Sequence, residues 1–124
     1  MDKDLKPLHW IGSTLEDLKA MPDEVRRNLG FGLDQAQRGG KSPDAKPLKG
    51  FSGTGVLELV EDFKGDTYRG VYTVKFENTV YVLHVFQKKS KSGIKTPKQE
   101  IELIKSRLKQ AEEDFLARKA KRKT

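Results

Sequence analysis

The side chains best suited to chemistry are cations at the ends of two apolar segments that we interpret as neighbouring β-strands. Arg69 opens the first strand, and Lys88, Lys89 and Lys91 close the second. In an antiparallel pair, the start of one strand lies beside the end of the next. The cations are therefore expected to converge at one end of a small sheet, where they would form a phosphate site. They could also carry out chemistry on RNA without a metal ion.

The elements that must position these cations follow the order strand, helix, helix, three strands, helix. The expected elements are an edge strand at 8–11, a helical hairpin at 15–21 and 23–38, a loop at 39–55, strands at 56–63, 68–77 and 79–88, and a last helix from 96 onward. Short turns between the three strands predict an antiparallel meander. The predicted class is α+β: a small antiparallel β-sheet with an N-terminal helical hairpin and a C-terminal amphipathic helix.

Three local features refine this prediction. Gly30 and Gly32 weaken the second helix, so a break there is possible. The last strand is almost continuously apolar, which indicates a central strand covered on both faces. Thr96 and Pro97 are a good helix start, because threonine can be the N-cap and proline suits the first helical position. The basic end, residues 117–124, is expected to be frayed.

The composition limits the classes of protein to consider. A chain of 124 residues suggests a single domain over residues 1–124. It has no cysteine, which excludes disulfides and thiolate–metal sites. No apolar run approaches the roughly 20 residues of a membrane span, and the first residues lack the pattern of a secretion signal. We therefore expect a cytoplasmic protein.

The net charge of +7 is spread unevenly along the chain. Residues 1–62 carry nine Lys or Arg and eleven Asp or Glu, whereas residues 63–124 carry sixteen and seven. A basic half beside a nearly neutral half suggests a polyanionic partner, most simply nucleic acid. The alternative is charge that serves solubility, together with a basic tail.

Five short segments carry a resemblance to a known family. They are Lys46–Gly50, Gly55–Leu59, Tyr68–Tyr72, Leu83–Lys89 and Thr96–Pro97. Together they resemble the RelE/ParE superfamily of toxins from bacterial type II toxin–antitoxin systems, and they are most similar to its phage-derived Gp49-like, HigB-like branch. The arginine at one strand start and the later lysine pair are fairly specific in combination.

The resemblance implies a RelE-like toxin that acts as a ribosome-dependent mRNA endonuclease, or mRNA interferase. Such a toxin enters the ribosomal A site, cleaves mRNA without a metal or other cofactor, and inhibits translation. It also implies a cognate antitoxin, often with a helix-turn-helix domain, which would bind the toxin and repress the operon. Operator DNA would then be contacted only through the antitoxin. The hairpin around 15–33 and the last helix are the best candidates for the antitoxin surface.

Metal-free RNA cleavage has three needs: the 2′-hydroxyl must lose a proton, the phosphorane must be stabilised, and the departing 5′-oxygen must gain a proton. Arg69 suits the second role, because its fork of donors matches phosphate oxygens and stays protonated. Its alternative is a surface cation paired with Asp66 or Glu58. Glu58 is a candidate general base, and its alternative is a structural partner of Arg69. The better-studied RelE pattern has lysines on this strand, so the identity of the base stays open.

Lys88 and Lys89 are candidates for phosphate contact or proton donation. Neighbours on a strand point to opposite faces, so only one is expected to line the site, and the resemblance implies Lys89. A lysine among other cations has a lowered pKa, which makes it a better acid or base near neutral pH. Lys91 and Lys95 are expected to contact the backbone of rRNA or mRNA. The alternative for Lys88, Lys89 and Lys91 is a solvated charge run.

Three further residues have both a functional and a structural interpretation. His84 is favoured as a hydrogen-bonded core histidine, but it could be an acid or base if it faces the cleft with Lys88. Phe86 could stack on an RNA base, although core packing is favoured. Lys49 could bind a phosphate at the border of the cleft or only aid solubility. His9 is given no role.

Two other functions compete with RNA cleavage. The same fold hosts toxins that inhibit gyrase, and small basic domains serve as RNA-binding or adaptor proteins, so fold alone does not decide. The pair Arg69 and Lys89 discriminates, because gyrase-directed relatives need not keep it. A third alternative is a prophage remnant that binds its antitoxin but no longer cuts RNA, and the intact set of cations argues against it.

Overall fold

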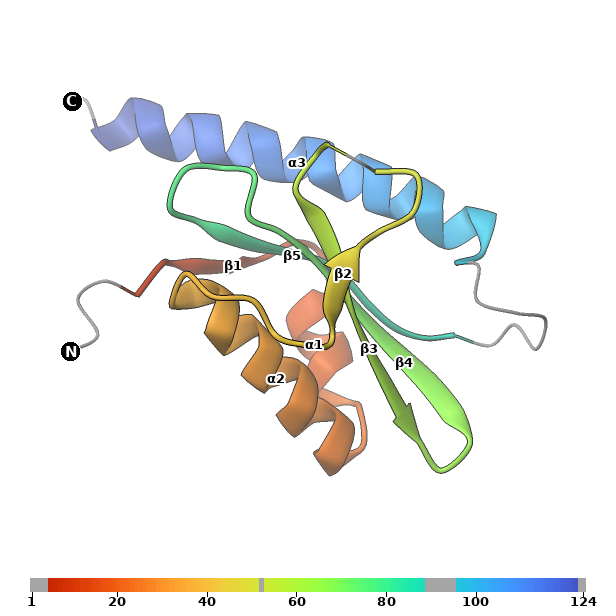
Figure 1. The fold of residues 1–124 in the computed structure, drawn as a ribbon. Coiled ribbons are helices and arrows are strands. Elements are labelled where there is room, and N and C mark those ends of the chain that lie inside the picture. The colour runs from red at the N-terminus through yellow and green to blue at the C-terminus, as the bar shows by residue number, and fades with distance from the viewer. Residues whose placement is uncertain (1–4, 52, 89–95, 123–124) are drawn as a thin grey trace.

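Five strands form a single sheet, with helices on both of its sides (Figure 1). The computed structural model describes residues 5–51, 53–88 and 96–122. In chain order the elements are β1 (Leu8–Trp10), α1 (Thr14–Lys19), α2 (Asp23–Gln37), β2 (Ala45–Pro47), β3 (Val56–Phe63), β4 (Asp66–Thr73), β5 (Val80–Lys88) and α3 (Lys98–Arg122). The α+β class predicted from the sequence is confirmed.

The strands lie in the order β1-β5-β4-β3-β2. The meander β3–β4–β5 is antiparallel, as predicted, whereas the edge strand β1 runs parallel to β5. The second edge strand, β2, lies within residues 39–55, where the sequence predicts only loop. It pairs with β3 over three residues, and Pro47 is tolerated because an edge strand has one unpaired side. A strand this short shows no alternation by which a sequence could reveal it.

The strands β4 and β5 depart from the regular pattern that the sequence predicts. β4 ends at Thr73 rather than at Glu77. Val71 pairs with His84 but the next residue of β4 pairs with Val82, so Leu83 is the extra residue of a bulge. Leu83 belongs to the core beneath α3, and His84 bonds to side chains of α3. The bulge therefore turns two consecutive side chains toward the same helix.

Two apolar cores lie on opposite faces of the sheet. The core on the α3 side includes Ile104 and Phe115 of that helix, whereas the core on the other side includes Leu29 and Leu33 of α2. In Figure 1, α3 passes along one side of the sheet while α1 and α2 lie on the other. β5 is buried along almost its whole length, which confirms the prediction of a strand covered on both faces.

The helix α2 is continuous through both of its glycines, so the possible break at Gly30 or Gly32 is not found. The two glycines differ in their surroundings. A Cβ at Gly32 would lie 2.7 Å from a methyl carbon of Leu59 on β3, whereas a Cβ at Gly30 would have nothing within 4 Å. Gly32 is therefore a point of close approach between helix and sheet, and packing against β3 outweighs the weak helix propensity of glycine.

This difference predicts opposite effects of two matched substitutions on stability. Gly30→Ala is expected to raise the free energy of unfolding by up to about 1 kcal/mol, because alanine is the better helix former. Gly32→Ala is expected to lower it by about 1–2 kcal/mol, because overpacking exceeds that gain. Urea unfolding of both variants measures the difference. An equal stabilisation by the two alanines would contradict the close contact with Leu59.

The last helix is longer at its C-terminal end than the sequence predicts. Residues 117–122 belong to α3, where a frayed basic tail is expected. The last turn carries Lys119, Lys121 and Arg122, and cations interact favourably with the negative end of a helix dipole. Within the described ranges, no helix combines the length and the apolar character needed to cross a bilayer.

Candidate active site

Five predicted site residues on the described strands lie on the face of the sheet that α3 covers: Glu58, Arg69, His84, Phe86 and Lys88. Glu58 on β3 pairs in register with Val71 on β4, and Val71 pairs with His84 on β5. Arg69, two positions before Val71, pairs with Phe86. Residues opposite one another in antiparallel strands, or two apart on one strand, project from the same face. The register therefore brings residues from three strands to one surface.

Arg69 and Glu58 form a buried ion pair across β3 and β4. Nη1 of Arg69 donates to Oε1 of Glu58, and the two side chains are only 5% and 6% exposed. The alternative interpretation, a surface cation paired with Asp66 or Glu58, is thus half right. Glu58 is the partner of Arg69, but Arg69 is buried rather than at the surface. Burying two charges costs several kcal/mol per ion in lost hydration, so such a pair is weak evidence for a purely stabilising role.

Lys88 adds a second buried cation at the end of β5. It pairs in register with Thr67, two positions before Arg69, and is 8% exposed. Burial lowers its pKa most, Arg69 and Lys46 lower it further, and Glu58 opposes them. The sequence also predicts a lowered pKa for this lysine, but the main cause is lost hydration rather than neighbouring cations. Lys88 is thus better suited to exchange protons near neutral pH than an exposed lysine.

A pocket of about 380 Å³ opens beside this ion pair. It is lined by Lys46, Pro47, Leu48, Lys49, Glu58, Thr96 and Ile101. Thr96 and Ile101 flank the first turn of α3, whose N–H groups and dipole attract anions. Two lysines, a helix start and a carboxylate thus meet at one opening, which suits a phosphate group flanked by a reacting hydroxyl.

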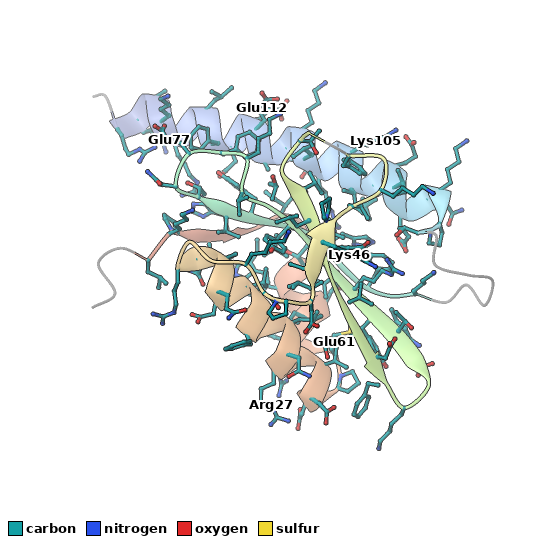
Figure 2. All side chains as sticks on the ribbon, viewed as in Figure 1. Arg27, Lys46, Glu61, Glu77, Lys105 and Glu112 are labelled. Atoms are coloured by element: carbon teal, nitrogen blue, oxygen red, sulfur yellow. The ribbon has the colours of Figure 1, made fainter. Side chains whose placement is uncertain are left out.

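Lys46 is a site residue that the sequence does not single out. Figure 2 labels Lys46 on β2. Lys46 pairs in register with Glu58 and lines the pocket with Lys49. The available signal is its place in the segment Lys46–Gly50, which carries part of the family resemblance. Its position beside Glu58 depends on β2, a strand that no sequence pattern reveals. Lys49 lies where the sequence predicts, at the border of the pocket.

His84 is held by α3 on both sides of its ring. Nε2 lies 2.9 Å from Oε1 of Glu100, and Nδ1 lies 3.3 Å from Nη1 of Arg107. A guanidinium can only donate, so Nδ1 accepts and Nε2 carries the proton that bonds to Glu100. Burial lowers the pKa of His84, although Glu100 opposes the shift. The neutral, doubly bonded ring supports the interpretation as a core histidine, held by two α3 residues that the sequence does not identify.

The lowered pKa of His84 predicts a loss of stability in mild acid. The unfolded chain takes up a proton near the usual pKa of 6.5, whereas the folded histidine takes it up only at lower pH. The free energy of unfolding is therefore expected to fall as the pH decreases below about 6.5, and less so in His84→Gln. Urea unfolding between pH 7.5 and 5.5 measures this slope. Burial and Arg118 also lower the pKa of His9, so His9 contributes to the same slope. His9→Gln is therefore the matched variant that measures this contribution separately. An unchanged slope in His84→Gln would contradict the assignment.

Phe86 packs within the protein rather than at its surface. Its ring is stacked on His84, with centroids 4.4 Å apart and planes at 16°, and it is 8% exposed. It belongs to the core beneath α3, so the structure supports its core interpretation over stacking on an RNA base. The other predicted RNA contacts, Lys91 and Lys95, and the candidate Lys89 lie outside the described residues.

Comparisons with known proteins identify the family and a similar fold. Residues 16–109 match the family described as Phage derived protein Gp49-like (DUF891). A similar solved structure is that of a mutant of the E. coli toxin RelE in the free state, with a TM-score of 0.51 and 21% sequence identity. The likeness covers 70% of this chain and 87% of the RelE chain, and at this identity it concerns the fold alone. No curated protein matches the sequence. The RelE-like fold predicted from the sequence is confirmed.

Proposed function

We propose that this chain, which belongs to the phage-derived Gp49-like family, is a type II toxin that cleaves mRNA on the ribosome and so inhibits translation. The observation that carries the proposal is the buried pair of Arg69 and Glu58, with Lys88 close by and a lysine-lined pocket at its edge. These groups match the three needs of metal-free RNA cleavage. The family and the fold are those expected of a RelE-like toxin.

In the proposed reaction, the 2′-oxygen of one nucleotide attacks the neighbouring phosphorus. The bond from phosphorus to the 5′-oxygen breaks, leaving a 2′,3′-cyclic phosphate and a 5′-hydroxyl. Glu58 accepts the proton of the 2′-hydroxyl, and Lys88 delivers a proton to the departing 5′-oxygen. Arg69 stabilises the negative charge of the phosphorane. Because a guanidinium carries five N–H donors in a fork, Arg69 can hold Glu58 and a phosphate oxygen together.

The pocket would position the RNA backbone for this step. Lys46 and Lys49 supply charge at its wall, and the pocket lies beside the start of α3, where the helix dipole favours an anion. Lys91 and Lys95 follow β5 in the sequence and would contact the backbone of mRNA or rRNA. A cradle of this kind recognises phosphate rather than base, since phosphate contacts position a nucleic acid without reading its sequence.

The small number of accessible acid and base groups at the site supports a dependence on the ribosome. Glu58 and Lys88 are both less than a tenth exposed, and His84 has both ring nitrogens engaged. The ribosome would orient the mRNA in the site and add polar groups that the site itself lacks. The toxin would therefore act in the cytoplasm, and a cognate antitoxin would hold it inactive there.

Primer extension on a reporter mRNA in a reconstituted translation system tests this function. New 5′ ends that appear only when ribosomes are present are expected from the wild-type protein. Cuts of equal frequency in naked mRNA would overturn the ribosome dependence. Normal translation without any new ends would overturn the nuclease function itself and favour gyrase inhibition or a purely binding role.

A further inference from the structure

A second pocket, of about 420 Å³, is lined by residues near the C-terminal end of α3 and so lies at the far end of that helix from the candidate active site. Its walls include His9 of β1, Tyr81 of β5, and Phe115, Arg118, Lys121 and Arg122 of α3. Three of these are cations, and among the described residues that line this pocket none is acidic. Because α3 rises about 1.5 Å per residue, roughly 20 Å separate Ile101 in the first pocket from Phe115 in the second.

The three cations share one face of the helix. Arg118, Lys121 and Arg122 are spaced by three and four positions, the spacing that brings side chains together on an α-helix. They stand in the last turns of α3, where the helix dipole favours positive charge. Residues 117–122 are helical rather than frayed, and this order is what gives the cations a common direction.

Arg118 is anchored by a hydrogen-bonded relay that reaches into the sheet. The hydroxyl of the fully buried Tyr81 donates to Oδ2 of Asp114 at 2.6 Å, and Nε of Arg118 donates to the same oxygen at 2.6 Å. Although burial opposes it, these two hydrogen bonds lower the pKa of Asp114 and keep it ionised. The guanidinium is thus held in place before any ligand arrives, which reduces the entropy lost on binding.

Aromatic rings form most of the rest of the wall, beside Pro7 and Thr79. The ring of His9 lies 5.1 Å from that of Tyr81, and Phe115 is stacked on Phe76 at 5.4 Å. Burial and the nearby Arg118 lower the pKa of His9, so it contributes a neutral ring near pH 7. Arginine and lysine beside ring faces are the combination by which proteins hold a single-stranded nucleic acid, with phosphate on the cations and a base against a ring.

We propose that this second pocket binds single-stranded RNA, with a backbone phosphate held by Arg118, Lys121 and Arg122 and the adjacent base against His9. The inference rests on the proposed function only in its choice of RNA as the polyanion. An acidic peptide would find the same cations, but it has no planar base to set against the ring. At roughly 20 Å from the first pocket, this site holds the strand and takes no part in breaking it.

The test measures the affinity for a fluorescein-labelled oligouridylate of about twelve nucleotides by fluorescence anisotropy at several salt concentrations. The test variant is Arg118→Gln/Lys121→Gln/Arg122→Gln. The control variant, Arg27→Gln/Lys105→Gln/Lys109→Gln, removes the same charge from exposed positions that do not line the pocket. Figure 2 labels Arg27 and Lys105. If the test variant unfolds, Lys121→Gln/Arg122→Gln replaces it, because that variant keeps the bond between Arg118 and Asp114.

The test variant is expected to bind at least about 10-fold more weakly, and the control variant less than about 3-fold. Loss of the contact with one backbone phosphate should reduce the slope of log affinity against log salt by about 0.7. Equal weakening in both variants would overturn the proposal, because only general charge would then matter. A poly-glutamate peptide that displaces the RNA as well as unlabelled RNA does would also overturn it.

A second readout separates the pocket from the cleavage function. In NMR titrations, 5′-AMP is expected to shift the resonances of His9 at concentrations where inorganic phosphate does not. Equal shifts with both ligands would overturn the role of the base. Primer extension is carried out on the same variants. RNA binding at the pocket without any mRNA cleavage would overturn the proposed nuclease function but leave the proposed binding site intact. If the test variant cleaves mRNA and its RNA affinity is unchanged, only the proposed binding site is overturned.

Discussion

Arg69→Ala is expected to reduce mRNA cleavage by about 100-fold or more, because it removes the cation that would stabilise the phosphorane. The same substitution leaves the buried carboxylate of Glu58 without its arginine, and the loss of one partner of a buried ion pair typically costs about 3–5 kcal/mol. A loss of activity alone would therefore not distinguish lost chemistry from lost folding. Lys105→Ala, which removes an exposed cation of α3, controls for charge and should cleave as the wild type does.

A double substitution separates the two effects. Glu58→Met/Arg69→Met replaces both charges by apolar side chains of similar length, and such replacements are often neutral or stabilising. The double variant is expected to recover the stability that Arg69→Ala loses, while cleavage stays at or below the level of Arg69→Ala because the proposed general base is lost as well. Urea unfolding and primer extension on the same preparations measure both quantities. Recovery of cleavage in the double variant would show that the ion pair is only structural.

Lys88→Ala is expected to reduce cleavage by about 100- to 10,000-fold, the usual range for loss of a general acid or base. Lys88→Arg keeps the charge but fixes the proton, because arginine stays protonated, so it should restore little of the rate. An acid works only while protonated, and burial lowers the pKa of Lys88. The wild-type rate should therefore fall on the alkaline side at a lower pH than an exposed lysine would give, and this limb should vanish in Lys88→Arg.

Lys89 provides the comparison that decides between the two neighbouring lysines. The family resemblance implies Lys89, whereas the structure describes Lys88 on the face of Arg69 and Glu58. Single-turnover cleavage rates of Lys88→Ala and Lys89→Ala are compared at one pH. A smaller loss for Lys89→Ala is expected. A larger loss for Lys89→Ala would return the proton-donor role to Lys89. A full rate in Lys88→Arg would leave Lys88 with a purely electrostatic role.

Regular patterns in the sequence were sufficient to predict the main elements. The meander of β3, β4 and β5 is visible as apolar segments separated by short turns, and α2 and α3 as apolar residues at helical spacing. The meeting of Arg69 and Lys88 at one end of the sheet follows from strand direction alone. These features are local or depend only on neighbouring elements, and for this reason a single sequence reveals them.

Features that depend on distant packing were not accessible in this way. Lys46 reaches Glu58 only through β2, and Glu100 meets His84 only because α3 crosses the sheet at that point. The bulge at Leu83 leaves no mark on the apolar pattern of β5. Whether Gly32 breaks a helix or admits a close neighbour likewise depends on the position of β3. The meeting of Arg69, Glu58 and Lys88 was thus easier to predict than the partners that hold the residues of the candidate site in place.

The most direct test of the central claim is cleavage of an mRNA that carries a single 2′-deoxynucleotide at the mapped cut site, in the reconstituted translation system. The proposed reaction begins with attack by the 2′-oxygen, so the substituted mRNA should remain intact while the unmodified mRNA is cut. The cut product of the unmodified mRNA should end in a 2′,3′-cyclic phosphate, opposite a new 5′-hydroxyl. Cleavage of both mRNAs at the same rate, or of neither, would contradict the account.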